Sequence, residues 1–137
     1  MSRWPNAFFF AASIYILIGA NWGLYMSITH DFATAPAHAH LNLLGWVSLA
    51  LMGSFYALLG KNTPPWLVKT NFFLSNLGVI AMITGLGLLF TGKATVPQLA
   101  PLIAVGELSV IGGFISFAWA VFVSLGVRLS QRRSVAA

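Results

Sequence analysis

Long apolar runs alternate with short polar breaks along the 137 residues of this chain. A helix needs about 20 apolar residues to cross the hydrocarbon core of a bilayer, and each run approaches or exceeds that length without a lysine or arginine. Prolines and glycines mark the breaks, and runs this long and continuous favour helices over barrel strands. The pattern predicts four membrane-spanning helices, over residues 7–28, 39–60, 72–90 and 99–127.

The composition strengthens this prediction. Hydrophobic residues make up 58% of the chain and charged residues 7%, whereas soluble domains carry about 25% charged residues. We therefore expect an all-α integral membrane protein whose single membrane domain, residues 1–137, is a four-transmembrane-helix bundle. The sequence has no cysteine, which excludes disulfides, thiolate zinc sites, iron–sulfur clusters and covalent attachment of haem through a C-x-x-C-H motif.

The basic residues predict the orientation of the chain. Only Lys93 falls in the break between the third and fourth runs, and the other basic residues flank the opposite ends of the runs, at Arg3, Lys61, Lys69, Arg128, Arg132 and Arg133. By the positive-inside rule both termini are cytoplasmic (N-in/C-in), and the histidine loop faces outward from the inner, cytoplasmic membrane. Membrane lipid is then the surrounding partner, and topology rather than nucleic-acid binding explains the net charge of +5.

Two further patterns concern helix packing. The motifs Gly19-x-x-x-Gly23 and Ser109-x-x-x-Gly113 allow close helix approach, either within one chain or between subunits. Four tryptophans near the ends of the runs are expected to be interfacial anchors, at Trp22, Trp46, Trp66 and Trp119.

Few polar residues lie in or beside the runs, and they are the candidates for chemistry: His30, Asp31, His38, His40, Asn42, Asn76 and Glu107. Water in the outer loop solvates Asp31, and Asn76 is expected to bond a neighbouring helix. Glu107 is the only acid inside a run, and an ionisable residue within a membrane indicates function by default. The alternative for Glu107 is a protonated carboxyl bonded to a backbone carbonyl or an asparagine.

The histidines allow two arrangements, which depend on where the second helix begins. A helix that begins at Pro36 places His38 and His40 about 200° apart around its axis, too far apart to bind one metal. A helix that begins near Ala39 leaves His38 in the loop, where it can join His30 and His40 in a site for copper or zinc. The spacing therefore predicts a metal or haem site without choosing between these arrangements.

The stretch from His40 to Trp46, with sequence HLNLLGW, continues to Met52-Gly53-Ser54-Phe55-Tyr56. It resembles the second helix of haem–copper oxidase subunit I, especially in the cytochrome cbb3 and nitric oxide reductase branches. The wider pattern His-Ala-His-Leu-x-Leu-x-Gly-Trp also resembles a group of small proteins classed as subunit I homologues. In that family the corresponding histidine is an axial ligand of the low-spin haem. The resemblance therefore implies that His40 binds the iron of haem b.

The chain also departs from that family. A full subunit I has about twelve helices, with a second axial histidine and the copper-binding histidines on later helices, whereas the third and fourth runs here contain no histidine. We therefore expect no complete cytochrome c oxidase or nitric oxide reductase activity from this chain alone, and we assign no catalytic residue. Whether the chain is an enzyme is left open.

The leading interpretation is a b-type haem-binding membrane protein that relays electrons or binds a diatomic gas such as nitric oxide or oxygen. The second iron ligand comes from His38, His30, a neighbouring protomer or nothing, and Asn42 or Glu107 contacts a ligating imidazole or a propionate. Four short spans cover a macrocycle poorly, so a homo-oligomer is expected, with a redox partner protein if electrons are relayed.

Two alternatives remain. One is an outer-face copper- or zinc-binding membrane protein that uses His30, His38 and His40. The other is a structural or assembly subunit whose histidines are interfacial polar groups.

Overall fold

The structure, a computed structural model, describes the backbone of residues 3–136 and the side chains of residues 3–126. Every regular element in that part of the chain is helical: α1 (Trp4–Thr29), α2 (Ala35–His40), the π-helix η1 (Leu41–Ser48), α3 (Leu49–Leu58), α4 (Pro65–Phe90) and α5 (Val96–Ala136). Because α2, η1 and α3 follow one another without a break, residues 3–136 form four rods, each long and apolar enough to cross a membrane.

The four rods coincide with the four predicted spans, but their ends differ. The helices start earlier than the apolar runs, because first-turn residues such as Trp4 and Trp66 are helical although they are suited to the membrane interface. The second rod ends at Leu58 rather than Gly60. There the N–H of Gly60 donates to the carbonyl of Phe55 at 2.9 Å, which closes the helix with a turn.

Prolines lie in the first turn of each rod. They are Pro5, Pro36, Pro65 and Pro97. A first-turn N–H has no acceptor within its own helix, so proline loses no hydrogen bond there. The second rod therefore begins at Ala35, and His38 and His40 both belong to α2. The alternative in which His38 lies in a flexible loop is wrong.

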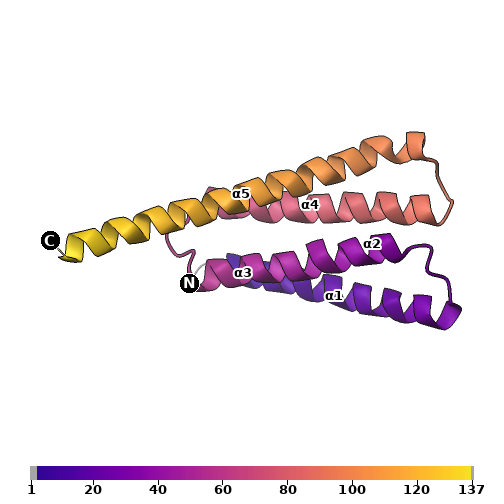
Figure 1. Cartoon of the computed structure of the whole chain (residues 1–137), viewed down its shortest axis with the longest axis horizontal. Coiled ribbons are helices and arrows are strands. Elements are labelled where there is room, and N and C mark those ends of the chain that lie inside the picture. The colour runs from indigo at the N-terminus through magenta and orange to yellow at the C-terminus, as the bar shows by residue number, and fades with distance from the viewer. Residues whose placement is uncertain (1–2, 137) are drawn as a thin grey trace.

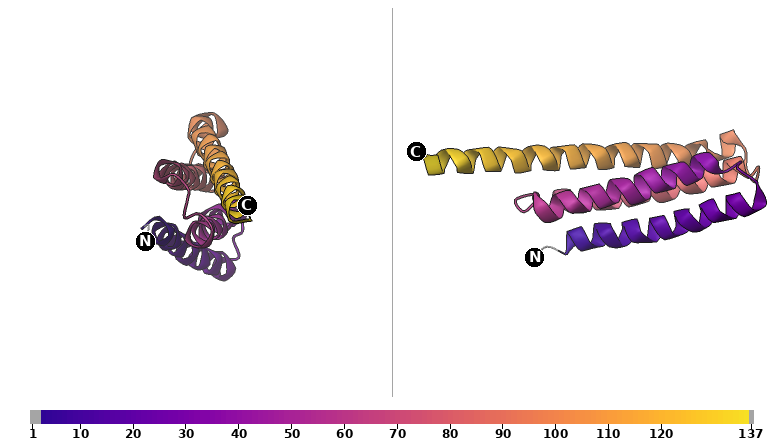
Figure 2. Two further views of the ribbon diagram at one scale, coloured as in Figure 1. Left: turned by 90° about the vertical axis from the view of Figure 1, so that its left-hand side faces the viewer. Right: turned by 60° about the horizontal axis from the view of Figure 1, so that its bottom comes forward.

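The rods form two antiparallel hairpins, α1 with α2–α3 and α4 with α5 (Figure 1). The loops 30–34 and 91–95 lie at one end, which we call the histidine end. The start of α1, the loop 59–64 and the far end of α5 lie at the other end, and α5 projects past the remaining helices there (Figure 2). The two ends of the chain thus lie on the same side of the bundle, while the assignment of that side to the cytoplasm stays a prediction.

Glycines bring α4 and α5 into close contact. A Cβ added to Gly106 would lie 2.6 Å from the backbone nitrogen of Met82, and one added to Gly113 would lie 2.6 Å from the hydroxyl of Ser75. Atoms larger than hydrogen do not fit at these positions. The predicted close approach at Ser109 and Gly113 therefore occurs between two helices of the same chain.

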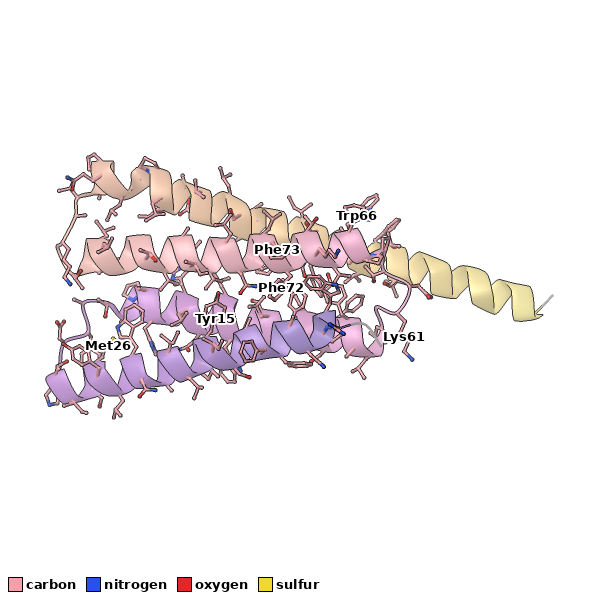
Figure 3. The ribbon with its side chains drawn as sticks, turned by 180° about the vertical axis from the view of Figure 1, so that it is seen from behind. Tyr15, Met26, Lys61, Trp66, Phe72 and Phe73 are labelled. Carbon is pink, nitrogen blue, oxygen red and sulfur yellow. The ribbon has the colours of Figure 1, made fainter. Side chains whose placement is uncertain are left out.

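Polar side chains tie the two hairpins together inside the bundle. The hydroxyl of Tyr15 in α1 donates to Oδ1 of Asn76 in α4 at 2.9 Å, which confirms that Asn76 bonds a neighbouring helix. Tyr15 lies between the hairpins in Figure 3, whereas Trp66 projects from the outer side of α4. Near the opposite end from the histidines, the hydroxyls of Thr63 and Ser124 are 2.8 Å apart.

Asn71 is the most connected polar residue of the core and is fully buried. Its Oδ1 accepts from the hydroxyl of Tyr56 at 3.0 Å, and its Nδ2 donates to the carbonyl of Gly113 at 2.8 Å. These bonds join α3, α4 and α5 at one point. The carboxamide of Asn71 thus supplies hydrogen bonds to buried polar groups, which lipid cannot do.

The outer surface of the bundle is apolar. Large hydrophobic side chains with more than half of their area exposed occur on every rod, for example Leu17, Leu43, Ile80 and Leu108. Such a surface is unsuited to water and suited to lipid. Together with the four rods it indicates a multi-pass membrane protein.

Candidate functional site

His40 is the last residue of α2, and its side chain is exposed on the outside of the chain. Its Nδ1 lies 2.7 Å from the carbonyl oxygen of Pro36, one turn earlier. A carbonyl can only accept, so Nδ1 carries the proton and donates it. In the neutral imidazole Nε2 then bears a lone pair and is directed away from Pro36. The backbone thus sets both the tautomer and the orientation of His40.

The π-helix η1 begins directly after His40. Segments of this kind are rare and are often found at functional sites. The hydroxyl of Ser48 donates to the carbonyl of Leu43, five residues earlier, at 2.8 Å. Gly45, within the same segment, faces Tyr15 of α1, where a Cβ would lie 2.8 Å from the ring carbon Cγ. The π-helix therefore lies where the second rod contacts α1, and it begins at the residue after the candidate ligand His40.

A small cavity of about 10 Å³ lies between the two hairpins, beside η1. Residues of all three surrounding rods line it, including Leu44 and Ser48 of η1, Ser75 and Val79 of α4, and Val110 and Phe114 of α5. Its size is at the lower limit for one water molecule. The cavity shows which sides of η1 and α5 face each other.

His40 and Glu107 both lie in the halves of their rods nearer the histidine end, and both side chains are exposed. The start of the second rod packs on α4 and α1, and the described contacts do not bring His40 and Glu107 together.

Glu107 is exposed, and it has no hydrogen bond or ion pair within the part of the chain that the structure describes. The alternative bond from its carboxyl to a backbone carbonyl or an asparagine is not formed there. A carboxyl held in hydrocarbon without a partner is costly. The carboxyl of Glu107 can therefore bond a polar group that reaches this face of α5.

His38 points the other way, toward α1. Its Nε2 accepts a hydrogen bond from Nδ2 of Asn42 at 3.1 Å, and its ring lies edge-on to Trp22 with centroids 6.5 Å apart. The two glycines of the predicted motif in α1 make room for this pair. A Cβ on Gly23 would lie 3.1 Å from Cε1 of His38, and one on Gly19 would overlap Oδ1 of Asn42.

Two buried polar atoms of this pair have no hydrogen-bond partner, Nδ1 of His38 and Oδ1 of Asn42. With Asn42 donating to Nε2, the proton of neutral His38 is on Nδ1, where no acceptor lies. If the amide of Asn42 is rotated by 180°, its Oδ1 accepts from Nε2 of His38 instead. Nδ1 of His38 and Nδ2 of Asn42 are then the unpaired atoms. In both arrangements Nε2 of His38 is hydrogen-bonded to Asn42. His38 and Asn42 therefore pack against α1 and are turned away from His40.

His30 ends α1 in the left-handed conformation with φ 55° and is exposed. In the loop that follows, Oδ1 of Asp31 accepts from the N–H of Ala33 at 3.0 Å. Within residues 3–126, no group of three or more histidine, aspartate or glutamate side chains is close enough to hold a metal ion. The structure therefore does not bring His30, His38 and His40 together in one chain.

Sequence reasoning missed two polar elements of the bundle. Asn71 lies one residue before the third apolar run, where it was indistinguishable from an interfacial residue. Trp22 was expected to be an interfacial anchor, yet its Nε1 donates to the hydroxyl of Thr34 at 2.9 Å and its ring packs on His38. The spacing of Asn71, Ser75 and Gly78 along one face was the signal for the first.

The residues around His40 fit a haem-binding site in which Nε2 of His40 would hold the iron. A neutral imidazole whose Nδ1–H is held by a carbonyl presents Nε2 to iron, which is the usual arrangement of ligating histidines. Leu43, which is 60% exposed, and Leu44 follow one turn later and offer apolar surface to a macrocycle. A second imidazole does not share this side of the rod, because His38 faces α1.

Comparison with known protein families, with curated proteins and with solved structures finds no match to this chain. The relationship to haem–copper oxidase subunit I therefore stays a prediction from residues 35–60.

Proposed function

We propose that this chain is a membrane protein that binds one b-type haem through Nε2 of His40 and uses it to bind a diatomic gas such as nitric oxide or oxygen. The observation that carries the proposal is the bond from Nδ1 of His40 to Pro36 at 2.7 Å, which leaves Nε2 free on an apolar surface. Bound haem supplies an iron centre that can coordinate such a gas.

The residues of the chain have separate tasks in this proposal. Pro36 orients the imidazole, Leu43 and Leu44 would keep water from it, and Glu107 would bond a propionate or another polar group. One available imidazole favours an iron with an open sixth position, and an open position favours gas binding over electron relay. The relay would require a second ligand from another chain.

A copper or zinc site of three histidines has less support from the geometry. His38 is engaged by Asn42 and packed against Trp22, while His40 is directed away from α1. Binding one metal through both would require α2 to unwind.

The proposal is tested by the optical spectrum of the protein purified from haem-replete cells. We expect a Soret band that His40→Ala removes and that added imidazole restores in His40→Gly. The matched control is His30→Ala, which changes an exposed histidine of the loop and should leave the band unchanged. Carbon monoxide or nitric oxide added after dithionite should shift the reduced spectrum, because the sixth position is open.

Glu107→Gln tests the role that the proposal assigns to this carboxyl. We expect a changed redox potential or haem occupancy with His40 still bound to iron. A protein without a Soret band after haem reconstitution would refute the proposal, and copper or zinc lost in both His30→Ala and His38→Ala would establish the metal-binding alternative.

A further inference from the structure

The outward face of α1 carries an ordered pattern although no part of the described chain covers it. Among its exposed side chains, six follow one another at alternating spacings of four and three residues, at Phe10, Ile14, Leu17, Asn21, Leu24 and Ile28. This is the spacing of the a and d positions of a coiled coil. Since α1 forms one edge of the bundle, the strip is accessible along about 27 Å (Figure 2).

The residue types at these positions are ordered as well. Ile14, Asn21 and Ile28 occupy one heptad position, and Phe10, Leu17 and Leu24 occupy the other. Isoleucine at a with leucine at d favours two parallel strands, and a single asparagine at a fixes the register of the pair. Contact with lipid requires only apolar side chains and explains neither this order nor the asparagine. The pattern therefore points to a second copy of the same helix.

Asn21 supplies the polar part of this argument. It lies eight residues before the end of α1, about 12 Å along the helix, and is exposed toward the lipid. One amide N–H donates to the carbonyl of Leu17 at 2.8 Å, while Oδ1 has no partner in the described chain. Polar groups facing hydrocarbon are stabilised by bonding across helices. A carboxamide is both donor and acceptor, so a second Asn21 across a two-fold axis satisfies it.

We propose that α1 pairs with α1 of a second copy in a parallel two-stranded seam centred on Asn21. The seam does not involve His40 or Glu107, so it does not depend on haem.

The chain contains no cysteine, so single cysteines report the seam directly. Ile14→Cys and Ile28→Cys place thiols at a positions, where the two copies come closest. We expect both to form disulfide-linked dimers on oxidation in native membranes. Ile80→Cys, on the exposed face of α4, is the matched control and should stay monomeric. Equal cross-linking at Ile80, or none at Ile14 and Ile28, would overturn the proposal.

Substitution of Asn21 measures the polar contribution. Interhelical polar contacts contribute about 1–2 kcal/mol in model peptides, so Asn21→Leu should weaken dimerisation about 5- to 30-fold. Thr84→Leu changes an exposed residue whose hydroxyl bonds only its own helix and should leave dimerisation unchanged. The Soret band of Asn21→Leu should equal that of the parent, which separates failure of the seam from failure of the haem site. A dimer of unchanged strength in Asn21→Leu would refute the role of the carboxamide.

Discussion

Gly19→Ala tests the contact that holds His38 and Asn42 against α1. The added Cβ would overlap Oδ1 of Asn42, and it would also lie 3.0 Å from Cγ and 3.3 Å from Nδ2 of the same side chain. Asn42 cannot move away freely, because Nδ2 is bonded to His38 at 3.1 Å. The methyl group therefore must either break that bond or separate the second rod from α1.

The magnitude follows from three contributions. Overpacking a filled contact costs about 1–3 kcal/mol. Loss of the bond between Asn42 and His38 costs about 0.6 kcal/mol on the average for membrane helices. Alanine in place of a helical glycine stabilises the helix by up to about 1 kcal/mol. We therefore expect Gly19→Ala to lower the free energy of unfolding by about 1–3 kcal/mol.

The assay is equilibrium unfolding in mixed micelles, followed by far-UV circular dichroism as the fraction of denaturing detergent rises. Gly87→Ala is the matched control, because its Cβ would meet only Trp22, at 3.8 Å. Asn42→Ala in the Gly19→Ala background removes the obstacle. The free energy of unfolding of the double variant should then be at least about 1 kcal/mol higher than the value obtained by adding the effects of the two single changes. Additivity within about 0.5 kcal/mol would refute the steric argument.

Three further predictions use the same unfolding measurement. Asn71→Leu should cost about 2–4 kcal/mol, because it removes the bonds to Tyr56 and Gly113, together with longer ones to Met52 and Ser75, and leaves the hydroxyl of Tyr56 buried without a partner; Tyr56→Phe should cost little more in that background. Gly106→Ala should cost about 1–3 kcal/mol because its Cβ meets the backbone of α4, whereas Gly112→Ala meets only the end of a leucine side chain and should cost less. Asn76→Leu should cost about 0.6 kcal/mol and at most about 1.7 kcal/mol, the range for hydrogen bonds between membrane helices.

Asn71 and the rod ends show where sequence reasoning is strong and where it is weak. Lipid imposes a length and an apolar composition on a spanning helix, so the four rods follow from hydropathy alone. Helix ends do not follow in this way, because interfacial residues such as Trp4 and Trp66 are helical without being apolar enough for hydrocarbon. Asn71 fell outside the third run for the same reason, although it is the most connected polar residue of the core.

The two histidines of α2 show a different limit. Their spacing predicts that they diverge, but it does not say which one faces the bundle. That choice depends on Gly19 and Gly23, which make α1 able to receive Asn42 and His38 from a rod some 20 residues further along the chain. Contacts between segments so far apart in sequence carry no local signal. The η1 segment is also unpredictable from hydropathy, because a π-helix and an α-helix present similar apolar runs.

The contacts of His38 explain why His40 is available. Asn42 and His38 fit against Gly19 and Gly23 of α1 and bond each other, which favours one rotation of the second rod about its axis. With that rotation set, the residue two positions on is turned about 200° away, out of the contact with α1. His40 is then exposed because His38 is engaged, and its own bond to Pro36 completes the orientation. The two-residue spacing therefore lets one histidine contact α1 while the other stays exposed, which is the arrangement that the proposed ligand role of His40 requires.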